Sequence, residues 1–117
     1  MTGVQTCALP IFITGLSSCN DVFYAGGYIY WSRSTTIGRA LANGTGVNNS
    51  FITGCSTAFG LVVDATNGYI YWTNFSGSSI GRANIDGTGV NQTFITTGAS
   101  PFDVNIDFVN GKLYWAH

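Results

Sequence analysis

Residues 28–31 of this chain read YIYW, and the pattern recurs as YIYW at residues 69–72 and as KLYW at residues 112–115. The tryptophans that close the three motifs are 41 and 43 residues apart. A second motif, Ile-Gly-Arg-Ala, begins at Ile37 and returns at Ile80, again 43 residues later. Two motifs that recur in the same order at similar spacing indicate an internal repeat of roughly 40 residues.

Each repeat contains four short runs of β-branched and aromatic residues and no stretch with helical periodicity. Glycine-containing pairs precede the aromatic motifs: Gly26-Gly27 in the first repeat, and Asn-Gly at residues 67–68 and 110–111 in the next two. These pairs supply the positive φ angles that a tight hairpin requires. The pattern predicts four antiparallel strands per repeat, called a to d, with the aromatic motif on strand b and Ile-Gly-Arg-Ala on strand c.

A four-stranded antiparallel sheet that repeats at this spacing is typical of a β-propeller blade. The predicted fold class is therefore all-β, a propeller segment with about two and a half blades per chain. Two complete blades are expected at residues 22–53 and 61–96, strands a and b of a third at residues 104–115, and a lone strand d at residues 12–14. Since propellers typically have about 4 to 8 blades, we expect ring closure by oligomerisation.

The composition favours a folded binding or structural protein. Hydrophobic residues make up 45% of the 117 residues and aromatic residues 15%, which is ample for a core. Only 8% are charged and the net charge is −1, so we expect no nucleic-acid partner. No apolar run approaches the roughly 20 residues of a membrane-spanning helix, so we expect no membrane insertion. One histidine, and three cysteines without a CxxC pair, argue against a zinc site.

Two of the cysteines, Cys19 and Cys55, fall in comparable loops of successive repeats. Two interpretations stay open, because sequence alone cannot decide the connectivity. Either the two cysteines form a disulfide bond with each other, or both are free thiols.

The aromatic motifs and the residues after them read YWSR at residues 30–33, YWTN at residues 71–74 and YWAH at residues 114–117. They resemble the Tyr-Trp-Thr-Asp motif of the YWTD, or low-density-lipoprotein-receptor class B, repeats, and Ile-Gly-Arg-Ala also resembles that family's blade. The resemblance covers residues 12–117. It implies a six-bladed, usually extracytoplasmic propeller that acts as a binding platform or rigid spacer. The fourth motif position departs from the family's aspartate and is occupied by Arg33, Asn74 and His117.

Residues 1–11, MTGVQTCALPI, match no part of the repeat and resemble the translation of a DNA sequencing adapter. We therefore predict a non-native leader on a chain that is truncated from a longer gene. Two chains arranged head to tail would give six blades, with strands a and b of one C-terminus joined by strand d of the other N-terminus. Residues 2–6 are short, polar and β-compatible, so they are a candidate for the missing strand c. The alternatives are a larger ring or aggregation of an incomplete chain.

Paired aromatic residues are the first candidate site residues. Exposed pairs would stack on a carbohydrate, but successive side chains of a strand face opposite ways, which favours packing between blades. We therefore predict a structural role for the repeat pairs Tyr30, Trp31, Tyr71, Trp72, Tyr114 and Trp115.

The second set of candidate residues is charged. Arg39 and Arg82 either bind an anionic ligand or make the same structural contact in successive blades, with Asp64 or Asp107 as partner. The two aspartates can also line a central channel and hold calcium, but one carboxylate per repeat is too few for the roughly 6 to 8 oxygen ligands that calcium takes. We predict structural roles for all four residues and no metal site.

Groups for catalysis are scarce in this sequence. The single histidine, His117, is the last residue, and glutamate is absent. We predict a non-catalytic binding or scaffold propeller without a cofactor, extracellular or periplasmic, that binds a protein or a carbohydrate at its polar top or central channel. One alternative is a fragment of a metal-dependent propeller lyase of the streptogramin-inactivating type, which would need histidine and glutamate near a metal. Another is that the chain has no selected function.

Overall fold

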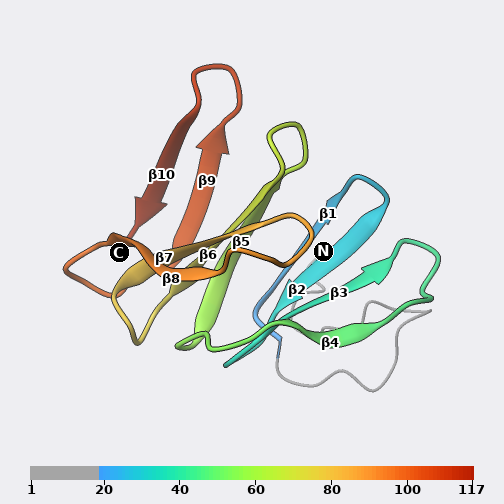
Figure 1. Ribbon diagram of the computed structural model, residues 1–117. Coiled ribbons are helices and arrows are strands. Elements are labelled where there is room, and N and C mark those ends of the chain that lie inside the picture. The colour runs from blue at the N-terminus through green and yellow to red at the C-terminus, as the bar shows by residue number, and fades with distance from the viewer. Residues whose placement is uncertain (1–18) are drawn as a thin grey trace.

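The computed structural model describes residues 19–117, which form ten β-strands and no helix (Figure 1). The strands are β1 (Asp21–Ala25), β2 (Tyr28–Ser32), β3 (Ile37–Leu41), β4 (Asn48–Ile52), β5 (Ala58–Asp64), β6 (Tyr69–Asn74), β7 (Ser79–Asn84), β8 (Asn91–Thr96), β9 (Asp103–Asp107) and β10 (Lys112–Ala116). The predicted leader, the predicted strand at residues 12–14 and the predicted role of residues 2–6 lie outside the described residues.

Strands that follow one another in the chain pair with one another in space. The first sheet has the order β1-β2-β3-β4, the second has the order β5-β6-β7-β8, and every neighbouring pair is antiparallel. β9 and β10 form a separate antiparallel hairpin that corresponds to strands a and b. The predicted all-β fold with four-stranded antiparallel blades is confirmed. We call the three units the first blade, the second blade and the third hairpin.

The hairpins between strands a and b differ in length from blade to blade. In the first blade, Gly26 and Gly27 alone join the strands, with φ angles of 60° and 85°. In the second blade four residues, 65–68, join β5 to β6, and only Gly68 among them has a positive φ, of 80°. The Asn-Gly pair therefore does not form the two-residue turn that the sequence suggests, because Asp64 organises a longer turn around it.

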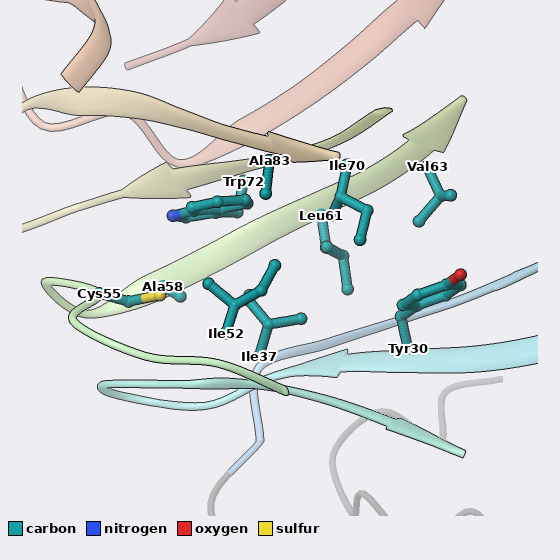
Figure 2. Packing of buried hydrophobic residues seen from close by; sticks show 10 residues of the cluster. All are labelled: Tyr30, Ile37, Ile52, Cys55, Ala58, Leu61, Val63, Ile70, Trp72 and Ala83. Atoms are coloured by element: carbon teal, nitrogen blue, oxygen red, sulfur yellow. The ribbon is translucent and has the colours of Figure 1, made fainter. Parts of the chain in front are cut away.

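The largest core cluster lies between the first and second blades (Figure 2). Tyr30 and Ile37 of the first blade meet Ile70 and Trp72 of the second blade there, and all four have no exposed surface. Strands a of successive units, β1, β5 and β9, lie side by side (Figure 1). Burying apolar surface between sheets, rather than within one, is what makes each blade depend on its neighbour.

The glycine of the Ile-Gly-Arg-Ala motif leaves room for the indole ring of the tryptophan on the neighbouring strand. Trp31 pairs with Gly38, and Trp72 pairs with Gly81. A Cβ atom at either glycine would overlap the indole ring of its partner. The two sequence motifs are therefore two halves of one packing unit, repeated in both blades.

The cysteine pair left open by the sequence does not form. Cys55 is a free thiol, buried in the cluster between the two blades. Cys19 is disulfide-bonded, with a partner other than Cys55. The free-thiol interpretation therefore holds for Cys55 and is wrong for Cys19.

Candidate ligand-binding face

The Tyr-Trp pairs of the two complete blades are buried. Tyr30, Trp31 and Trp72 have no exposed surface, and Tyr71 is 9% exposed. Each pair divides between two interfaces, because Tyr30 joins the cluster between the first and second blades whereas Trp31 joins a cluster on the opposite side of its sheet. No ligand can stack on these four rings.

The equivalent pair on the third hairpin is open to solvent. Tyr114 is 55% exposed and Trp115 is 37% exposed. In the complete blades strand c pairs with strand b, but β10 pairs only with β9 among residues 19–117. Tyr114 and Trp115 are therefore exposed because no strand among residues 19–117 pairs with the second edge of β10.

The two motif arginines are held between aromatic rings, not by aspartates. The Arg39 guanidinium carbon lies 4.0 Å from the ring centre of Tyr28 and 4.1 Å from that of Phe51. Arg82 repeats the arrangement in the second blade, 4.2 Å from Tyr69 and 4.1 Å from Phe94. A cation over an aromatic face is attracted by the ring quadrupole, so each arginine ties strands b, c and d together.

Arg39 also links the two blades. One of its guanidinium nitrogens donates a hydrogen bond of 3.3 Å to the carbonyl oxygen of Ile85 in the second blade. The expected contacts of the arginines with Asp64 or Asp107 are not seen among the described residues. Those two carboxylates lie at the hairpins between strands a and b, away from strand c.

Each of these aspartates caps its own hairpin. Asp64 accepts hydrogen bonds from the backbone and side-chain nitrogens of Asn67, at 3.1 and 2.7 Å. Asp107 accepts the same two bonds from Asn110, at 3.2 and 2.8 Å, and these bonds lower its pKa. Their place in the structure is a turn cap, and the part of the chain that the structure describes holds no group of three metal-binding side chains.

The third position of the aromatic motif bonds one blade to the next. The hydroxyl of Ser32 donates to the carbonyl oxygen of Phe59 at 2.7 Å. Thr73, its counterpart, donates to the carbonyl oxygen of Phe102 at 3.3 Å and accepts from the Gly60 amide at 2.8 Å. Ala116 holds this place in the third hairpin and has no hydroxyl to donate.

These hydrogen bonds bring three phenylalanines together at the end of the blades where strands a begin. The ring centres of Phe59 and Phe102 are 5.2 Å apart, and Phe75 lies 5.6 Å from Phe59 and 5.3 Å from Phe102. Phe102 is 54% exposed. Phe59 and Phe75 are half-buried, so the three packed rings form a partly open surface suited to a ligand rather than a sealed core.

Two aspartates lie beside the rings. Asp21 begins β1, Asp103 begins β9, and Gly60 of β5 lies between them at the same position of the repeat. A Cβ at Gly60 would lie 2.9 Å from the Cα of Asp103, so glycine lets β9 approach β5 closely.

The two carboxylates interact electrostatically. Burial raises the pKa of Asp21 above its ordinary value of 3.8, the amides of Val22 and Leu61 lower it, and the negative charge of Asp103 raises it. Asp21 accepts hydrogen bonds from those two amides at 2.9 and 3.2 Å. Asp103 accepts one from the Val104 amide at 2.9 Å.

A cavity of about 250 Å³ connects these groups, lined by Asn20, Asp21, Phe59, Gly60, Phe102 and Asp103. We call this region, together with Phe75, the aromatic–aspartate face. It lies at the lower ends of β1, β5 and β9 in Figure 1. The prediction from the sequence placed the ligand at the polar top or central channel and included none of these residues among its site residues.

One signal for this face was present in the sequence. Phe59 and Phe102 are 43 residues apart, the spacing of the other repeat elements. Their convergence with Asp21 and Asp103 depends on how the blades stack, which no local pattern records.

Comparison with known proteins supports the same architecture. No protein-family model and no curated protein matches the chain. A solved structure, the crystal structure of a nidogen/laminin complex, matches with a TM-score of 0.75 and 24% sequence identity. The chain has the fold of propeller blades. The match covers 86% of this chain and 41% of the other, so the chain spans less than half the length of that neighbour.

In residues 19–117 no helix is long and apolar enough to cross a membrane.

Proposed function

We propose that this chain is part of a non-catalytic β-propeller of the YWTD type that binds a ligand on its aromatic–aspartate face. The observation that carries the proposal is the contrast between buried and open aromatic residues. The rings of the repeat motif in the two complete blades are buried in packing, whereas exposed Phe102 and half-buried Phe59 and Phe75 gather beside two carboxylates and a cavity. Binding sites combine an apolar surface with a few converging polar groups in this way.

The proposed ligand is a protein. A protein partner suits a shallow site at the mouth of a ring, and the solved neighbour is itself a complex of nidogen with laminin. The proposed location is extracellular or periplasmic, because YWTD propellers are usually found there.

We further propose that two chains close one ring of six blades. Within residues 19–117 no strand pairs with the second edge of β10, and the exposure of Tyr114 and Trp115 marks the surface that a further strand would cover. An unpaired strand edge with exposed aromatic residues favours association with another chain. Head-to-tail pairing of two copies would cover this edge in both.

The solution mass of the purified chain tests the assembly. We expect light scattering to give twice the chain mass of 12.4 kDa. A folded monomer would refute the two-chain ring. Trp115→Ser should shift the equilibrium toward monomer, because it removes apolar surface from the open hairpin. Val109→Ser is the matched control: Val109 is 91% exposed at the tip of the same hairpin, so this variant should keep the wild-type mass.

A further inference from the structure

The aromatic–aspartate face carries negative charge, and within residues 19–117 no cation acts on the Asp21 carboxylate. The only charged group that shifts the pKa of Asp21 is Asp103, which is also negative. Of the four basic side chains, Arg33 follows β2 and does not shift the pKa of Asp21, and Arg39 and Arg82 are held between rings of their own blades. In the strand register of the third hairpin, Lys112 lies opposite Asp107, at the other end of β9 from Asp103. Two neighbouring carboxylates therefore face the cavity together with the rings of Phe59 and Phe102.

The same chain shows how it holds a guanidinium group. Arg39 and Arg82 each lie about 4 Å from two aromatic ring centres. The aromatic–aspartate face combines aromatic rings with carboxylates, and no arginine of residues 19–117 lines its cavity. An aromatic face and a carboxylate together suit a guanidinium better than an ammonium, because the planar group stacks on a ring and bonds a carboxylate in the same plane.

The size of the cavity points to one side chain. At about 250 Å³ it is smaller than the roughly 300 to 1,000 Å³ of typical small-molecule pockets. The exposed ring of Phe102 extends the surface outside the cavity, so a polypeptide can continue along the face beyond the bound side chain.

We propose that this cavity binds an arginine side chain of a protein partner, with Asp103 as the main anionic contact and Phe102 as the stacking ring. The inference rests on the proposed binding function and specifies its ligand. Asp103 is exposed and accepts one backbone hydrogen bond, from Val104, so it retains oxygen lone pairs for an incoming donor. Asp21 accepts two backbone hydrogen bonds, so it contributes negative electrostatic potential at the site rather than a direct contact with the ligand.

The test is an NMR titration of the full chain with the peptide acetyl-Gly-Arg-Gly-amide. Its matched probe replaces arginine by citrulline, which has nearly the same shape without the charge. We expect saturable shifts at the amides of Phe102 and Asp103, with affinity on the order of millimolar. The citrulline peptide should bind at least about fivefold more weakly, since it loses the charge-assisted bonds.

Two variants locate the site. Asp103→Asn should weaken arginine binding about fivefold while still accepting the Val104 hydrogen bond, so the fold is kept. Asp86→Asn is the control of equal charge change. It lies on the turn between strands c and d, where the first blade already has asparagine at Asn43, and it should leave binding unchanged.

Equal binding of the citrulline and arginine peptides would overturn the inference, and so would tighter binding of a lysine peptide. A carbohydrate or acidic peptide that shifts the same amides would refute the arginine ligand while leaving the binding function standing. If none of these probes shifts the Phe102 and Asp103 amides at about 50 mM, both the inference and the proposed ligand face fail.

Discussion

The first and second blades carry the same YIYW and Ile-Gly-Arg-Ala motifs, yet they treat their buried tryptophans differently. In the second blade the indole nitrogen of Trp72 donates a 3.0 Å hydrogen bond to the side chain of Gln92. In the first blade the indole nitrogen of Trp31 is buried without a partner in the described part of the chain. Both rings have no exposed surface, so the shared motifs set the packing and other residues decide whether the polar atom is satisfied.

The residues that differ lie on strand d and at the fourth motif position. Gln92 corresponds to Asn49, whose side chain is one methylene shorter. Gln92 also accepts a 2.9 Å bond from Asn74, which is 1% exposed and whose own oxygen accepts the Ser56 amide at 3.0 Å. The first blade has Arg33 in the place of Asn74, and no such network is seen there within residues 19–117. An amide at the fourth position can therefore be buried and fully bonded where an arginine cannot.

The largest expected effect concerns the contact that both blades share, between the motif glycine and the buried tryptophan. Gly81→Ala would place a methyl group on the indole of Trp72, and we expect a loss of about 3 kcal/mol in the free energy of unfolding. Gly38→Ala should cost a similar amount in the first blade. Gly77→Ala is the control, because its Cβ would lie 3.2 Å from that of Ser56, and it should cost less than about 1 kcal/mol. Urea unfolding measures all three. Equal effects of Gly81→Ala and Gly77→Ala would refute the claim that the motif glycine is needed to accommodate the indole ring.

The interface between the two blades contains a thiol, Cys55, whose ionisation should lower the folding stability at alkaline pH. Burial raises the pKa of the Cys55 thiol from 9.0 to about 11, against a lowering by its contact with Gln92. Below pH 9 the thiol is protonated in both states. Between pH 9 and 11 the unfolded chain ionises first, so folding stability falls with rising pH, by up to about 3 kcal/mol.

Cys55→Ala supplies the reference for this measurement. Urea midpoints recorded from pH 8 to pH 11 include the titration of tyrosine and lysine in both proteins, so the difference between wild type and variant isolates the thiol. We expect the difference to shrink as the pH rises through this window. Parallel curves would show that the thiol ionises equally well in the folded chain.

The next effect lies in the residues that distinguish the blades. Gln92→Leu keeps the approximate volume of the side chain but removes the acceptor for Trp72 and one acceptor for Asn74, and we expect a loss of about 2 kcal/mol in unfolding free energy. Asn49→Leu makes the matched change at an exposed position of the first blade and should change stability by less than about 0.5 kcal/mol. If both variants lose the same amount in urea, the network in the second blade does not stabilise it.

The sequence predicted short antiparallel strands well because the signals for them recur within the residues of each blade. The repeated aromatic motif, the glycine turns and the 43-residue offset are local, and they located the strands, including Ile37 to Ala40 within β3. The pairing of Arg39 with rings was missed because its partners, Tyr28 and Phe51, come from two other strands. The aromatic–aspartate face was missed because it unites the starts of β1, β5 and β9, which only the stacking of blades brings together.

The smallest expected effect is a gain. Asn49→Gln would give the first blade the side chain with which the second blade satisfies Trp72, and a hydrogen bond to the Trp31 indole nitrogen should add about 0.5 to 1 kcal/mol to the free energy of unfolding. The gain should vanish in a Trp31→Phe background, since phenylalanine has no N–H to donate. A gain that persists there would come from strand propensity or solvation. A gain that disappears there would mean that one methylene at residue 49 decides whether the first blade satisfies its buried indole, and that the repeat tolerates an unsatisfied indole when the strand d side chain is too short to reach it.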